Sequence, residues 1–129
     1  NNLHKAMATL SHEPVVLMDD ADLWKAALDG RDSAARAALE RLCLSYGSVT
    51  GDLALAHGPH AVVLAGGLTQ RMQDFLVKDS GFYGRFTAKG RYETLMRTIP
   101  VRIAVHPEIG LFGAAAAWRE KVRHERKEP

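Results

Sequence analysis

Apolar residues recur every three or four positions along most of the chain, the spacing of helices with one buried face. The first such stretch, marked by Leu3, Met7 and Leu10, predicts an amphipathic helix that begins at or before the first residue. Pro14 ends it, and the apolar run 15–18 is compatible with a short strand. Asp19 then stands where a side chain caps a second helix, which we expect to end at Gly30.

The longest periodic stretch follows, with Asp32 or Ser33 as its cap and Gly58-Pro59 as its end. Its apolar positions alternate between spacings of four and three, and they are Ala35, Leu39, Leu42, Tyr46, Val49, Leu53 and Ala56. Gly47 and Gly51 are one turn apart on this helix. Such a pair lowers helix propensity but lets a second backbone come close.

An unbroken apolar run, residues 61–65, precedes the doublet Gly66-Gly67 and Leu68. A short apolar run bounded by turn signals predicts a strand buried on both faces, as parallel strands are. Ligands of open α/β sheets bind beyond the carboxyl ends of the strands, where glycine lets them approach the backbone. Taken by itself, the doublet is better explained by a tight strand-to-helix turn without a ligand, because glycine is common in turns generally. Thr69 is expected to cap the following helix.

The remaining stretches predict two short helices, a strand and a last helix. Phe82 and Phe86 mark the first helix, Gly90 is expected to stop it, and the second reaches Ile99. Residues 101–105 alternate as a strand does. The last helix starts around Gly110 and places four apolar residues on one face before frayed charges from residue 119 to 129; these four are Leu111, Ala115, Trp118 and Val122.

Strand, helices and strand in this order predict a helix-rich α/β fold with a parallel βαβ unit. Two parallel strands cannot cover their own faces and edges, and parallel sheets usually have four or more strands. We therefore expect an incomplete sheet that associates with strands from elsewhere or belongs to a larger fold.

Composition narrows the function classes. The chain has 129 residues, a size typical of one domain, and 47% of them are hydrophobic. Its formal net charge is +2, so no strong field favours nucleic acid or a membrane surface, and the basic residues after 118 are interrupted by glutamates. No apolar run approaches the ~20 residues of a membrane span. A single cysteine, Cys43, suits a reducing cytosol.

Chemical motifs are scarce. The six histidines include no pair with zinc-ligand spacing, and neither a P-loop nor a Gly-x-Gly-x-x-Gly turn is present. The acidic group Asp19, Asp20 and Asp22 is better explained as a helix start than as a metal site. We identify no catalytic residue and no metal ligand in the chain.

Five segments stand out together in a fixed order, and they are residues 64–68 (LAGGL), 86–92 (FTAKGRY), 99–101 (IPV), His106 and 110–115 (GLFGAA). This ordered set resembles the carboxyl-terminal part of bacterial ATP-dependent glucokinase. The likeness extends back through the long helix and its Gly51-Asp52 ending to residues 2–5. It covers nearly all of the chain but only about the last two fifths of a full-length enzyme, whose size fits two domains.

The resemblance implies the fold of the actin, Hsp70 and sugar-kinase superfamily, with two α/β domains around a cleft. Gly66, Gly67 and Leu68 then match the adenosine motif, and residues 110–117 the last connecting helix. Lys89-Gly90-Arg91 is a family marker for which we expect only surface structure. The implied reaction is transfer of the γ-phosphoryl group of ATP, with Mg²⁺, to the 6-hydroxyl of glucose.

The family's phosphate loops, aspartate base and sugar-binding residues all precede residue 1. We therefore expect residues 1–129 to be the carboxyl-terminal part of the large, nucleotide-side domain, inactive alone and dependent on the preceding part of the same protein. A cytoplasmic homodimer is expected. The alternative is a non-catalytic helical module that self-associates through the long helix and open sheet edges. A nucleic-acid binder with a basic tail is a remote third option.

Overall fold

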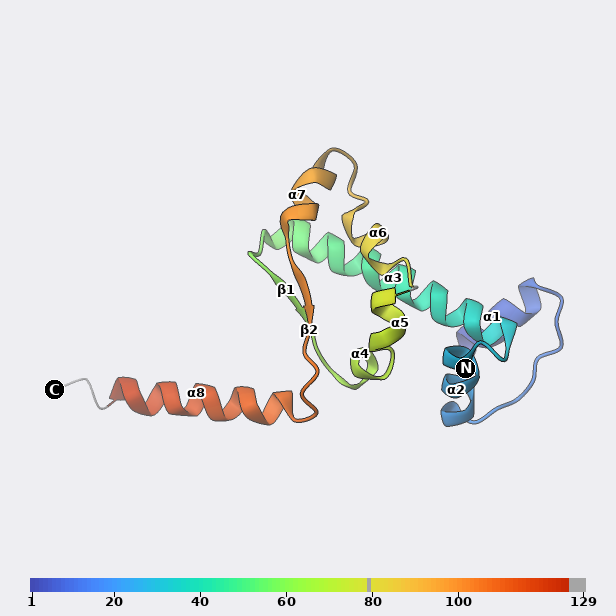
Figure 1. Ribbon diagram of the computed structural model, residues 1–129, viewed down its shortest axis with the longest axis horizontal. Helices are drawn as coiled ribbons and strands as arrows, with labels where there is room; N and C mark the ends of the chain where they lie inside the picture. The colour runs from blue at the N-terminus through green and yellow to red at the C-terminus, as the bar shows by residue number, and fades with distance from the viewer. Residues whose placement is uncertain (79, 126–129) are drawn as a thin grey trace.

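One long helix organises the computed structural model, which describes residues 1–78 and 80–125 (Figure 1). Helix α3, Ser33–His57, has 25 residues. The carboxylate of Asp32 caps it by accepting a hydrogen bond of 2.6 Å from the backbone N–H of Ala35. Gly58 ends it in the left-handed conformation, with φ at 58°. Both predicted ends are confirmed.

Two shorter helices pack against the amino-terminal part of α3. They are α1, Asn2–Leu10, and α2, Asp20–Asp29. Asp19 caps α2 by accepting a hydrogen bond of 2.8 Å from Asp22, and Gly30 closes it with φ at 69°, as predicted. The strand proposed at residues 15–18 is wrong, because this segment has no regular structure and its valines and leucine are exposed.

The buried face of α3 differs from the predicted stripe. Val49 and Leu53 are 56% and 57% exposed, whereas Cys43, Gly47 and Gly51 are buried. The glycines explain the rotation, because helix α6, Phe82–Thr87, lies directly against them. A Cβ atom at Gly47 would lie 3.0 Å from the carbonyl carbon of Phe82 and closer still to its oxygen. The close backbone approach predicted for this pair is confirmed.

The sheet of the described residues has two parallel strands, β1, Val62–Leu64, and β2, Val101–Ile103. Val62 is in register with Val101 and Leu64 with Ile103. Leu64 is buried but Val63 is 61% exposed, so burial on both faces was a wrong prediction for β1. Adjacent strand residues point to opposite faces, and only the face of Leu64 meets the core.

Short helices form the connection between the strands. They are α4, Gly67–Arg71; α5, Gln73–Lys78; α6; the 3₁₀ helix η1, Gly90–Tyr92; and α7, Glu93–Thr98. Thr69 lies inside α4 and does not cap it, and Gly90 begins η1 after α6 has already ended at Thr87. Both predictions were wrong, because Gly66 caps α4 three residues before Thr69 and Ala88 caps the end of α6 two residues before Gly90.

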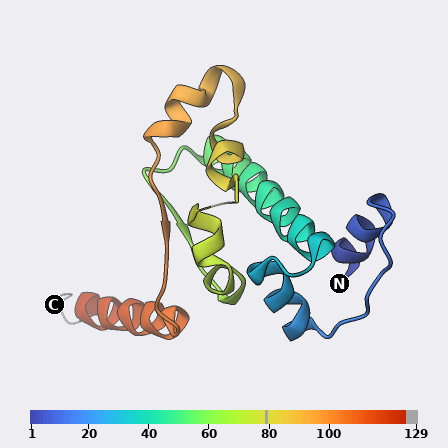
Figure 2. The same ribbon diagram turned by 45° about the vertical axis from the view of Figure 1, so that its right-hand side comes forward.

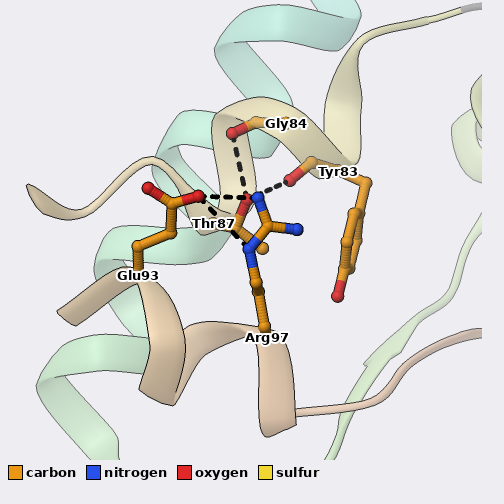
Figure 3. A network of polar contacts seen from close by, with 5 residues as sticks. All are labelled: Tyr83, Gly84, Thr87, Glu93 and Arg97. Carbon is orange, nitrogen blue, oxygen red and sulfur yellow. Dashed lines mark hydrogen bonds and ion pairs between the residues drawn. The ribbon is translucent and has the colours of Figure 1, made fainter.

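Local polar contacts lie within α6 and within α7 (Figure 3). The hydroxyl of Thr87 donates to the carbonyl oxygens of Tyr83 and Gly84 at 3.1 and 3.3 Å. Arg97 donates to one oxygen of Glu93 at 2.6 and 3.2 Å, one turn apart on α7. Each contact therefore stabilises its own helix from within.

Helix α8, Ile109–Glu125, extends away from the other elements in both views (Figures 1 and 2). Leu111 and Trp118 on its predicted apolar face are 69% and 66% exposed. The helix is regular to Glu125, so the predicted fraying from residue 119 is wrong over that span. Residues 126–129 of that prediction lie outside the described residues.

Candidate functional site

The two strands end side by side, and the glycine doublet lies at that end. After β1 the chain passes through Ala65 and Gly66 and enters α4 at Gly67. The last backbone bond between the strands joins the N–H of Ala104 to the carbonyl of Leu64 at 2.8 Å. Gly66 and Gly67 are exposed, and Leu68 is 48% exposed. The predicted site residues therefore form an open edge of the sheet.

The two glycines differ in what the fold requires of them. Gly66 has φ at 105°, a conformation that L side chains rarely adopt, so the backbone itself requires glycine there. Gly67 has no such φ, and a Cβ atom built on it would meet nothing within 4 Å. Neither backbone conformation nor packing within the described residues explains glycine at position 67.

Two consecutive side chains anchor the turn. Thr69 is 2% exposed, and its hydroxyl is 3.2 Å from the hydroxyl of Tyr46 on α3. The side-chain amide of Gln70 donates a hydrogen bond of 2.8 Å to the carbonyl oxygen of His106, in the segment that follows β2. The first contact ties the turn to the core and the second ties it to the segment after β2.

His106 is itself fixed where the chain leaves the sheet for α8. Its Nδ1 accepts a hydrogen bond of 3.1 Å from the backbone N–H of Glu108. Its ring meets the ring of Phe112 edge-on, with centroids 4.5 Å apart. In the sequence His106 stands out only as part of the family resemblance. Its carbonyl as the partner of Gln70 carries no sequence signal, because every residue has a carbonyl.

The buried thiol of Cys43 has no nucleophilic role in this arrangement. The pKa of Cys43 is raised to about 11, mainly by burial, while the charge of Arg36 lowers it and that of Glu40 raises it by smaller amounts. The thiol is fully buried and lies 3.9 Å from the sulfur of Met72. It is therefore protonated near neutral pH and packs as a small apolar side chain.

Within residues 1–78 and 80–125, no group of three or more His, Cys, Asp or Glu side chains could hold a metal ion. Asp19 is engaged as the cap of α2, and His4 lies 3.4 Å from the capping carboxylate Asp32. An apolar cavity of about 110 Å³ between α1, α2 and α3 is lined by Trp24 and Leu39 among others, away from the glycine turn. No helix in the described part of the chain is long and apolar enough to cross a membrane.

The side chain of Lys89 is buried, which corrects the expectation of surface structure at this one residue of the segment 89–91, whereas Gly90 and Arg91 are exposed. Its side chain is 8% exposed and crosses Gly51 of α3. The ammonium group donates to the carbonyl oxygen of Ser48 at 2.9 Å and to the carboxylate of Asp52 at 2.6 Å. Arg91, by contrast, is exposed and lies over the ring of Tyr92.

Comparison with known proteins gives one consistent match. The sequence model of the family described as "Glucokinase" matches residues 1–121. The chain is 48% identical over 120 residues to a glucokinase of Zymomonas mobilis, covering 93% of this chain and 37% of that protein. It is 37% identical over 116 residues to a glucokinase of Stenotrophomonas maltophilia, covering 89% of this chain and 34% of that protein.

A solved structure agrees. The crystal structure of a glucokinase from an Antarctic psychrotroph superposes with a TM-score of 0.79 at 34% identity. The match covers 92% of this chain and 37% of the other. The chain thus spans about a third of the length of the curated relatives it matches.

Proposed function

Because this chain belongs to the glucokinase family, we propose that the complete protein transfers the γ-phosphoryl group of ATP to glucose and forms glucose 6-phosphate. The observation that carries the proposal is the match over residues 1–121, which spans every element of the fold up to most of α8. On this proposal the protein is a cytoplasmic hexose phosphotransferase of glucose metabolism, and a homodimer.

The described residues form the carboxyl-terminal part of the large, nucleotide-side domain of an actin-like sugar-kinase fold, with ATP as the phosphoryl donor. Gly66, Gly67 and Leu68 are its wall on the adenosine side. Two observations support this position: the turn lies at the carboxyl ends of parallel strands, where ligands of α/β sheets bind. The second observation is Gly67, where neither the backbone conformation nor the packing of the described residues requires glycine. The backbone there is open to the flat face of a purine.

Catalysis requires groups outside this segment. Phosphoryl transfer needs a base for the attacking hydroxyl, donors around the phosphates and Mg²⁺ to neutralise their charge. We assign no catalytic residue among residues 1–129, and the metal and phosphate ligands belong to the preceding part of the same protein. The residues of this chain bind and orient the nucleoside. The hydrogen bonds of Lys89 to Ser48 and Asp52 on α3 hold the connection between the two strands in place.

The alternative, a non-catalytic helical module that self-associates, is not favoured. Relatives of two genera are named glucokinase and align over 89% or more of this chain, so no part of the described fold is left for a separate role.

The first test is turnover with glucose and MgATP, measured for the complete protein and for residues 1–129 separately. We expect activity in the complete protein and none in the short chain. Robust activity of residues 1–129 would contradict the placement of catalysis upstream. A complete protein that ignores glucose and phosphorylates another sugar would overturn the substrate.

The second test concerns the nucleotide wall. In the complete protein, Gly67→Val places a branched side chain on the open face and should raise KM for ATP at least about tenfold, with KM for glucose unchanged. Gly84→Val is the matched control, because Gly84 is an exposed helical glycine with equally free space. An unchanged KM for ATP in Gly67→Val would remove the site from residues 66–68.

A further inference from the structure

The glycine turn is held from two sides by neighbouring residues. Thr69 reaches inward to Tyr46 on α3, and Gln70 reaches sideways to His106 beyond β2. Gly66, Gly67 and Leu68 lie exposed just before these two anchors. The backbone of the turn therefore depends on both for its position relative to the end of β2.

The contact made by Gln70 takes over where the strand pairing ends. The last backbone bond of the pair joins Leu64 to Ala104, and the chains then diverge into α4 and toward α8. Two residues after Ala104, the carbonyl oxygen of His106 accepts a hydrogen bond of 2.8 Å from the side-chain amide of Gln70. This distance is that of a well-formed hydrogen bond.

The acceptor of this bond is in a fixed segment. The ring of His106 accepts from the N–H of Glu108 and packs against Phe112, so the peptide that carries the acceptor carbonyl is restrained. Gln70 is half-buried and His106 is exposed, so the bond lies at the surface, where the geometry of its two partners holds it. The bond thus sets the spacing between the turn and the chain that leaves β2.

We propose that Gln70 is a positioning residue for the nucleotide: by donating to the carbonyl of His106 it fixes the backbone of residues 66–68 in the conformation that the nucleoside contacts. The proposal rests on the proposed function of the turn. Gln70 acts through the turn and need not touch the ligand. Without this hydrogen bond the turn and the chain after β2 move apart. Part of the binding free energy of the nucleotide must then bring them back to the spacing that the nucleoside contacts.

Three variants of the complete protein separate this role from others. Gln70→Met keeps the length of the side chain but removes the donor, and Gln70→Glu replaces the donor with an acceptor that repels the carbonyl. Gln70→Lys restores an N–H donor of similar reach. The matched control is Gln73→Met, because Gln73 is also half-buried and makes no hydrogen bond through its side chain to any described residue.

We expect Gln70→Met to raise KM for ATP, and the dissociation constant of ATP measured by calorimetry, about fivefold, the factor that corresponds to one ordinary hydrogen bond. Gln70→Glu should raise both further, and Gln70→Lys should return them toward wild type. KM for glucose and the midpoint of thermal unfolding should stay as in Gln73→Met.

Several results overturn the proposal. ATP binding in Gln70→Met equal to that in Gln73→Met would show that the bond does not position the turn. Equal losses in ATP binding, glucose binding and thermal stability, without rescue by Gln70→Lys, would show a general structural role. If the wild-type protein binds ATP but does not phosphorylate glucose, the proposed function fails while calorimetry still tests Gln70. If it does not bind ATP at all, both fail.

Discussion

Adding one methyl group at Gly47 should cost more stability than the better helix propensity returns. The new Cβ atom would lie 3.0 Å from the carbonyl carbon of Phe82 and 3.1 Å from its Cα, with the oxygen closer still. These are backbone atoms of α6, so no flexible side chain can move aside. Ordinary contact requires α6 to retreat by about 1 Å.

That retreat acts on the most tightly packed part of the molecule. Phe82 and Phe86 on α6 are 4% and 0% exposed, and Phe82 packs edge-on against Tyr46 of α3. Overpacking of this kind costs about 3 kcal/mol when backbone must shift. Replacing a helical glycine with alanine returns about 1 kcal/mol. Gly47→Ala should therefore lower the free energy of unfolding by about 2 kcal/mol.

The assay is urea unfolding of the complete protein, with Gly84→Ala as the control. Gly84 lies in α6 on the exposed side, and a Cβ atom there meets nothing within 4 Å. In the control, helix propensity alone should raise the free energy of unfolding by about 0.5 to 1 kcal/mol. Equal gains in both variants would refute the close approach of α6 to α3.

Three further changes test other contacts. Lys89→Met leaves the partly buried carbonyl oxygen of Ser48 without its charged donor and should lower the free energy of unfolding by about 2 kcal/mol. Asp52→Asn, at the exposed end of the same side chain, should lower it by less than about 1 kcal/mol in the same urea titration. Asp32→Ala removes the cap of α3 and should lower the free energy of unfolding by about 1 kcal/mol. Cys43 should resist alkylation in the folded protein and react after unfolding. Its pKa rises from 9.0 to about 11, so its contribution to stability is complete below pH 9 and is lost as the pH rises through about 11, which unfolding midpoints across that range measure.

Helix ends and glycine contacts could be predicted from the sequence because each depends on local chemistry. Asp19 and Asp32 cap their helices through side chains that reach only three residues ahead. Gly30 and Gly58 adopt the left-handed conformation that few other residues tolerate. The parallel pairing of β1 with β2 could be predicted from the order of strand, helices and strand along the chain.

Burial was harder to predict because it depends on which neighbours are present. Val63, Val49 and Leu53 have apolar side chains at the expected periods, yet all three are more than half exposed. Periodicity identifies the apolar face of an element but not the element that covers it. The role of Gln70 had no sequence signature, because its partner is a backbone carbonyl 36 residues away.

The position of α3 has a consequence for how the chain opens. This one helix contacts α1, α2, α6 and α7, and its central amides near Gly47 and Gly51 can exchange with solvent only when α6 separates from it. Helix α8 has almost entirely exposed side chains in this chain, and its amides can exchange by opening that helix alone. Hydrogen exchange should therefore divide the fold into a slow unit centred on α3 and a fast one formed by α8, with the glycine turn at the boundary between them.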